Sequence, residues 1–198
     1  MRDQILNAAY NSFAIESDSI TESAKVLDSE QLLKAVEALA TAERIGAAGC
    51  GHSGIACQHF AHLMCCIERP ARFISPAAAV HGAMGYIQTG DVLLWASRGG
   101  KTDELIPIVN ICKQKGATII GVTENLSSPL AEMSDIVLAM KVTRECDKYN
   151  CQGTTSFAVT CTIFDALQSA LIERTNYQNE KFAVVHPGGA VGKRLNNK

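Results

Sequence analysis

Short apolar runs alternate with stretches of helical periodicity along most of the chain. Five runs bounded by glycine or polar residues have the pattern of buried strands, at 44–48, 72–74, 91–96, 118–123 and 136–140. Helical patterns separate them, at 55–66, 105–114, 129–133 and 154–173. Strands that alternate with helices at this spacing predict an α/β protein with a doubly wound, mainly five-stranded parallel sheet flanked by helices.

Two further helices are predicted before the first strand. Residues 2–27 place Ile5, Phe13 and Ile20 at helical spacing, and Asp28 or Ser29 is a suitable N-cap for a second helix. Such additions pack either on a partner subunit or on the sheet of their own domain, and the pattern does not choose between these. No linker or repeat interrupts the chain. We therefore expect one domain over 1–198, with N-terminal helices over 1–42 and an α/β core over 43–198.

Composition narrows the class of protein. The formal net charge of −2 provides no basic face, which argues against nucleic acid as a partner. We expect no membrane span, because no apolar run approaches about 20 residues, and no signal peptide in the polar N-terminus. The eight cysteines include no CxxC pair, and several lie in predicted helices, which favours reduced thiols. A cytoplasmic location is expected.

The segment 97–102, Ser-Arg-Gly-Gly-Lys-Thr, joins the predicted strand at 91–96 to a helix. A small-residue loop with hydroxyls at a helix start favours a phosphate cradle, because backbone N–H groups and the positive helix end point into it. The alternative is an ordinary strand–helix turn. A nucleotide P-loop is excluded by spacing, since it would need glycine where the chain has Trp95.

A second glycine loop, 49–54, follows the first predicted strand and reads GxGxxG. A dinucleotide site would also need an acidic residue at the tip of the second strand, but that strand ends in Ser75-Pro76. A close strand-to-helix turn that admits a ligand fits better, with His52 and Ser53 at its rim. Both glycine loops follow parallel strands, so both are expected in the crevice at the carboxyl ends of the sheet.

Several histidines could have chemical or structural roles. His59, His62 and Cys66 lie along one helical stripe, which is compatible with zinc but equally with a helix packed on a sheet, so no metal is predicted. His81 is a lone histidine in a connection made of small residues, and the pattern leaves both a structural and a catalytic role open. His186 belongs to the tail FAVVHPGGAVGKRL, where Pro187 and the glycines predict a tight bend that positions the imidazole.

The segment 143–156 leaves the last predicted strand and enters the long helix. Glu145 and Asp147 are the only acids expected at the crevice-facing end of the sheet. Thr154, Thr155 and Ser156 are placed to cap the helix or to bind an anion, and one residue can do both.

The order of GCGHSG, VHGAMG, SRGGKT, GTTS and HPGGAVGKRL over 44–195 resembles the sugar isomerase (SIS) domain, in its arabinose-5-phosphate isomerase branch. The resemblance implies interconversion of aldose and ketose phosphates through an enediol, no cofactor, and a homo-oligomer, dimer or tetramer, with shared active sites. It implies catalytic roles for His81, Glu145 and His186. The implied substrate or phosphate contacts are Gly51, His52, Ser53, Ser97, Arg98, Gly99, Gly100, Lys101, Thr102, Thr154, Thr155 and Ser156. Members usually carry CBS modules after the HPGG ending, and none is expected here.

The chain departs from this branch at several positions. His52 stands where a lysine is usual, Lys101 replaces a glutamate proposed as catalytic, and Arg98 adds a second cation. An acidic pair expected at Ala78 and Ala83 is absent. Added cations should strengthen anion binding. The resemblance thus leaves two hypotheses: an isomerase with Glu145 as base and the histidines as acids, or a sugar-phosphate-binding sensor or regulator without catalysis.

Overall fold

A central parallel sheet organises the protein, for which the computed structural model describes residues 1–196. The sheet contains five parallel strands in the order β2-β1-β3-β4-β5, which confirms the predicted fold class. Each strand lies within one residue of its predicted bounds: β1 (Ile45–Gly49), β2 (Ala71–Phe73), β3 (Val92–Ala96), β4 (Thr118–Thr123) and β5 (Ile136–Ala139). The direction of strand order reverses between β1 and β3, so a ligand crevice is expected at the carboxyl ends of these two strands.

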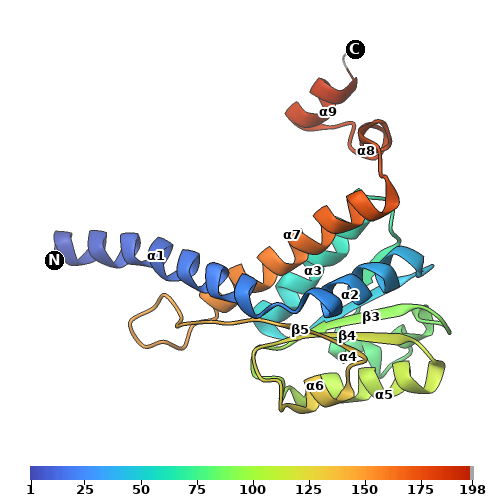
Figure 1. The fold of residues 1–198 in the computed structure, drawn as a ribbon, viewed down its shortest axis with the longest axis horizontal. Coiled ribbons are helices and arrows are strands. Elements are labelled where there is room, and N and C mark those ends of the chain that lie inside the picture. Colours follow the sequence, from blue (N-terminus) through green and yellow to red (C-terminus); the bar gives the residue numbers. More distant parts are fainter. Residues whose placement is uncertain (197–198) are drawn as a thin grey trace.

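Helices cover both faces of the sheet (Figure 1). One face carries α2 (Ser29–Thr41), α3 (Gly51–Cys66) and α7 (Thr155–Thr175). The other carries α4 (Pro76–Ala79), α5 (Ile106–Lys115), α6 (Pro129–Met133) and the 3₁₀ turns η1 (Ala83–Tyr86) and η2 (Asp103–Leu105). Alternate residues of one strand point to opposite faces, so Leu94 belongs to the first core cluster and Trp95 to the second.

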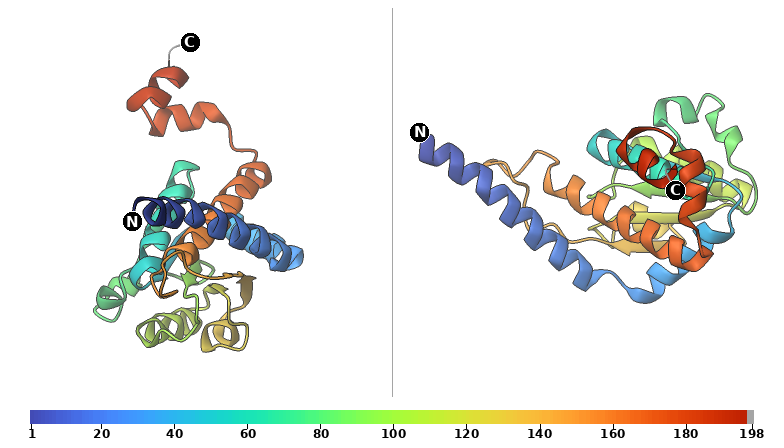
Figure 2. Two further views of the ribbon diagram at one scale, coloured as in Figure 1. Left: turned by 90° about the vertical axis from the view of Figure 1, so that its left-hand side faces the viewer. Right: turned by 90° about the horizontal axis from the view of Figure 1, so that it is seen from above.

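The two N-terminal helices contact their own chain differently: the second packs on the sheet, and the first packs on α7. Asp28 is the N-cap of α2, as predicted, and its carboxylate accepts a hydrogen bond from the Gln31 N–H at 2.8 Å. The second half of α1 (Arg2–Val26) is tied down by buried Ser19 and Ser23, which bond to segment 141–143 after β5. The first half of α1 extends away from the body and leaves Phe13 73% exposed (Figure 2).

Helix α7 is the one described helix that is long and apolar enough to cross a membrane by length and hydropathy. The sequence predicted this helix over 154–173 but no membrane span, because serine and threonine residues interrupt its apolar run. In the structure one face of α7 packs in the core, where Phe164, Leu167 and Leu171 are fully buried. The same composition is typical of a core helix.

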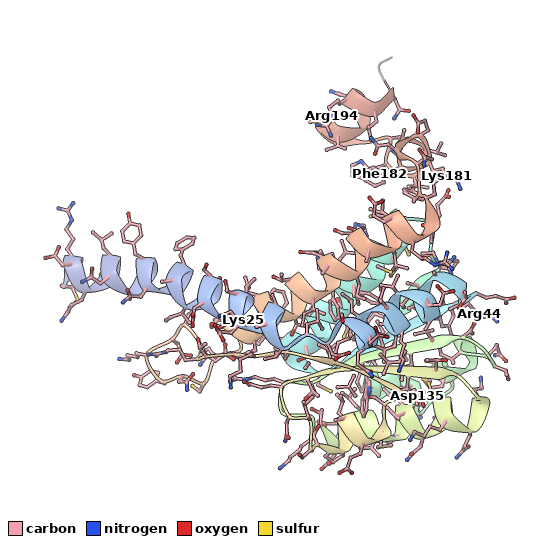
Figure 3. All side chains as sticks on the ribbon, viewed as in Figure 1. Lys25, Arg44, Asp135, Lys181, Phe182 and Arg194 are labelled. Carbon is pink, nitrogen blue, oxygen red and sulfur yellow. The ribbon has the colours of Figure 1, made fainter. Side chains whose placement is uncertain are left out.

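The tail forms two short helices that the sequence pattern did not predict. They are α8 (Asn179–Val185) and α9 (Gly189–Asn196), and the predicted bend at Pro187 lies between them. Together they stand away from the sheet beyond the end of α7, with Phe182 and Arg194 on this projecting arm (Figure 3). Residues 197–198 of the predicted domain lie outside the described residues.

Candidate functional site

The two glycine loops meet at the switch point of the sheet, since Gly49 of β1 is paired with Ala96 of β3. The first loop is shorter than predicted, because α3 begins at Gly51 rather than at residue 55. His52 and Ser53 therefore lie in the first helical turn. A Cβ on Gly54 would stand 2.7 Å from the Gly49 carbonyl oxygen, so the GxGxxG pattern here permits close packing of helix on strand.

The second loop, after β3, is closed by hydroxyl groups. The Ser97 and Thr102 hydroxyls are hydrogen-bonded at 2.9 Å, and the Gly100 N–H donates to the Ser97 hydroxyl at 3.1 Å. Ser97 is buried, whereas Lys101 is exposed and its ammonium group has no partner among the described residues. A Cβ on Gly99 would meet no atom within 4 Å, so the backbone is open at this position. The loop thus offers hydroxyls, open backbone and an available cation to an anion.

Arg98, in the same loop, turns toward two carboxylates. Its Nε donates to Glu124, just after β4, at 2.9 Å, and its Nη1 donates to Glu145 at 2.7 Å. Burial by itself raises the pKa of Glu124, but the hydrogen bonds from Arg98 and the Val142 N–H, with the charges of Arg98 and Lys141, hold that pKa below its usual range. Arg98, the added cation expected from the sequence, is therefore already paired with two carboxylates.

Glu145 is buried at the start of α7, with its side chain 4% exposed. One carboxylate oxygen accepts from Arg98, and the other accepts from the Thr154 hydroxyl at 3.3 Å and from the Ser156 N–H at 3.2 Å. Thr154 makes no side-chain cap of its own, so the Glu145 carboxylate caps α7 in its place. The carboxylate thus lies at the N-terminal end of this 21-residue helix.

The expectation that Glu145 and Asp147 are the only acids at this end of the sheet is wrong. Asp147 is half-buried and binds the backbone of its own loop, at the N–H groups of residues 149, 151 and 152. Glu124 and Glu104 lie at this end as well. Both were missed because one follows a strand and the other begins a helix, and the local sequence pattern does not show that these two segments meet at the same end of the sheet.

An open pocket of about 580 Å³ lies beside the first glycine loop, between α4 and η2. Glu104, Cys50 and Ser75 bring polar groups to its lining, and Val80 places the neighbouring, exposed His81 at its edge. Burial and the nearby Glu104 charge raise the pKa of the Cys50 thiol, so it stays protonated. Lys101 stands where the family resemblance expects a glutamate, yet Glu104 supplies a carboxylate to this crevice.

His52 links the start of α3 to the start of α7. Its ring lies edge-on to Phe157, with ring centroids 6.1 Å apart, and a Cβ on Gly153 would stand 3.0 Å from the imidazole. The first turns of two helices and the loop after β3 therefore surround one region, which contains Ser53, Glu145 and the Thr154–Ser156 hydroxyls.

His186 lies elsewhere in the chain. It follows α8, beyond the C-terminal end of α7, and lines a second pocket of about 540 Å³ with His62 and Tyr177. Glu145 lies at the opposite end of α7, and a helix of 21 residues is about 30 Å long. One chain by itself does not bring His186 to Glu145.

The stripe of His59, His62 and Cys66 does not gather into one cluster. His59 faces Asp165 at 3.5 Å, while His62 and Cys66 face each other at 3.7 Å. Among the described residues there is no group of three His, Cys, Asp or Glu side chains that could hold a metal ion.

Comparisons with known proteins agree on the relationship of the chain. The SIS domain model matches residues 38–170. Arabinose 5-phosphate isomerase KdsD of Pseudomonas aeruginosa is 35% identical over 191 residues, which are 96% of this chain and 58% of that protein. The chain thus spans little more than half the length of this curated relative.

Solved structures are similar over nearly their whole length. A candidate sugar-phosphate isomerase of Listeria monocytogenes is 40% identical, with a TM-score of 0.92 over 95% of this chain and 99% of that one. A candidate phosphosugar isomerase of Bacteroides fragilis, described as involved in capsule formation, is 26% identical, with a TM-score of 0.85 over 93% of this chain and 98% of that one.

Proposed function

Because the chain belongs to the SIS domain family, we propose that it is a sugar-phosphate isomerase that interconverts an aldose phosphate and a ketose phosphate through an enediol. The observation that carries this proposal is the 35% identity to an arabinose 5-phosphate isomerase across 96% of the chain. The arrangement of the site supports it, because a buried carboxylate lies near a loop suited to an anion.

In this proposal the substrate phosphate occupies the loop after β3, where hydroxyls, open backbone and the Lys101 ammonium face it. Ser53 and the Thr154 and Ser156 hydroxyls complete the anion seat, whereas Thr155 is fully buried and its hydroxyl is paired with the Cys146 thiol. Binding energy from the phosphate orients the carbon chain toward Glu145. The Glu145 carboxylate removes the proton from C2 of the aldose and returns it to C1, and the O2 proton moves to O1.

The two histidines supply proton transfer for ring opening in this proposal, because an imidazole exchanges protons near neutral pH. His81 is exposed and directly follows Val80, which lines the crevice of its own chain. His186 lies on the projecting arm, so we propose that it enters the site of a second copy in a cytoplasmic homo-oligomer, a dimer or a tetramer. The exposed Val184 and Val185 on the arm support burial against such a copy.

Deuterium incorporation tests the reaction directly. We expect one member of a panel of pentose and hexose phosphates, incubated with the protein in deuterated buffer, to acquire deuterium at C1 or C2. This exchange reports enediol formation even where little product accumulates. Binding of a sugar phosphate with no exchange in any member of the panel would refute the isomerase proposal.

Mixing two inactive variants tests the shared site. Glu145→Gln and His186→Ala should each lack turnover, and co-refolding them should restore a measurable fraction, because some sites then combine an intact Glu145 with an intact His186 of another copy. Light scattering of the unmixed protein checks for the oligomer. A monomer, or no recovery in a mixed oligomer, would contradict the shared site.

A sensor or regulator without catalysis is the second candidate. The Arg98–Glu145 hydrogen bond of 2.7 Å favours it, because this contact engages one carboxylate oxygen of Glu145 in a link between two parts of the chain. If the protein only binds the sugar phosphate, we expect the NMR signals of the ligand to broaden in the same deuterium experiment without isotope exchange. The deuterium experiment therefore distinguishes a Glu145 that acts as a base from a Glu145 with only a structural role.

A further inference from the structure

Arg98 stands between two carboxylates instead of facing the anion loop to which it belongs. Its backbone is held at the end of β4, because the Arg98 carbonyl accepts hydrogen bonds from the Glu124 N–H at 3.1 Å and from the Thr123 hydroxyl at 3.0 Å. Its side chain then reaches Glu124 and Glu145 through separate nitrogens, at 2.9 and 2.7 Å. The guanidinium thus connects the end of β4 to the start of α7.

The charges around Arg98 balance without a ligand. Two carboxylates, Glu124 and Glu145, face the guanidinium, and Lys141 adds a second positive charge 3.6 Å from Glu124. Arg144, the other cation nearby, points instead to the backbone carbonyls of residues 145 and 147. To bind a phosphate, the Arg98 side chain would have to leave both carboxylates. Lys101 would lose no contact, because it has no partner within residues 1–196.

Glu145 is held at both of its oxygens. Thr154 and the Ser156 N–H bind one oxygen, and Arg98 binds the other. Without Arg98, the carboxylate could rotate about its remaining contacts. The anchor behind Arg98 is itself fixed, because the second oxygen of Glu124 accepts from the Val142 N–H at 3.1 Å.

We propose that Arg98 is a positioning residue that orients Glu145, with Glu124 as its anchor, and that the Arg98 side chain is not a phosphate ligand. This proposal deepens the proposed function and rests on it for the catalytic consequence. It replaces the phosphate-binding role that the family resemblance implies for the Arg98 side chain.

The kinetic test compares Arg98→Asn with Lys101→Ala. Arg98→Asn should lower kcat about 10-fold or more and leave KM within about 2-fold, because it loosens the base and leaves the anion seat intact. Lys101→Ala should instead raise KM about 10-fold. A raised KM with unchanged kcat in Arg98→Asn would overturn the proposal.

The anchor is tested by Glu124→Ala and by Arg98→Lys. Glu124→Ala should also lower kcat. The kcat of the double variant with Arg98→Asn should be no lower than that of Arg98→Asn alone, because the two residues act as one unit. Arg98→Lys should recover only part of kcat, since an ammonium does not reproduce a planar group that donates from two nitrogens. Fully additive losses would contradict the role of Glu124 as anchor.

A binding measurement separates this proposal from the isomerase proposal. Inorganic phosphate titrated calorimetrically into the folded protein should bind Arg98→Asn within about 2-fold of the parent. A loss of 10-fold or more would make Arg98 a phosphate ligand and overturn the inference. If phosphate binding by Arg98→Asn is unchanged while no sugar phosphate exchanges deuterium, only the isomerase proposal falls.

Discussion

Replacing Glu145 with glutamine is expected to lower turnover about 10²- to 10⁴-fold, the usual contribution of a general base. The amide keeps the shape of the side chain and an oxygen that still accepts from Thr154 and the Ser156 N–H. It cannot take the proton from the substrate. Deuterium exchange into the sugar phosphate should therefore be lost, while calorimetric binding of the same compound remains within a few-fold.

Asp147→Asn is the matched control for this variant. It makes the same carboxylate-to-amide change two residues away, in a half-buried side chain that bonds to its own loop. We expect turnover within about 2-fold of the parent protein. Undiminished turnover in Glu145→Gln would remove Glu145 from the mechanism, and an equal loss in both variants would indicate disruption of the loop rather than of a base.

Gly100→Ala should destabilise the protein by about 2–5 kcal/mol and abolish anion binding. Gly100 has φ of +66°, where an L side chain costs about 1–2 kcal/mol, and its new Cβ would stand 2.0 Å from the Ser128 hydroxyl oxygen. Ser128 is fully buried and caps α6 by accepting from the Ala131 N–H, so it has little room to yield. The loop must move, and Ser97 moves with it.

Chemical denaturation measures the stability loss, and calorimetry with inorganic phosphate measures the binding loss. Gly99→Ala is the control, because its Cβ would meet no atom within 4 Å and its backbone lies outside the left-handed region. We expect it to unfold within about 0.5 kcal/mol of the parent protein. Equal stabilities for the two alanine variants would show that the loop after β3 yields freely and is not a fixed anion seat.

The strands and their order of appearance were accessible from the sequence for a local reason. Apolar runs such as 118–123 and the glycines that bound them reflect burial on both faces of a parallel sheet, and this pattern needs no knowledge of distant residues. The same holds for the Asp28 cap, which depends on residues three positions apart. Loop motifs likewise identified the family, because their glycines and hydroxyls are adjacent along the chain.

Errors arose where local patterns are weak or ambiguous. The start of α3 was predicted at residue 55, because glycines at 51 and 54 are typical of loops, yet both lie in the helix, where Gly54 permits contact with β1. Helices α8 and α9 were missed because their short, glycine- and proline-containing segment has little helical periodicity. Thr154 has a favoured capping side chain, but Glu145, nine residues earlier, supplies the cap.

The sequence by itself determined the fold class and the two glycine loops at one edge of the sheet, and its family resemblance led to the proposal of Glu145 as the base. Only the tertiary structure decided what these groups do to one another: that Arg98 is paired with Glu124 and Glu145, that Glu104 shares the crevice, and that His186 lies at the far end of α7. The physical reason is range. Burial and turn formation are recorded in neighbouring residues, whereas a salt bridge across 47 positions depends on how strands and helices pack.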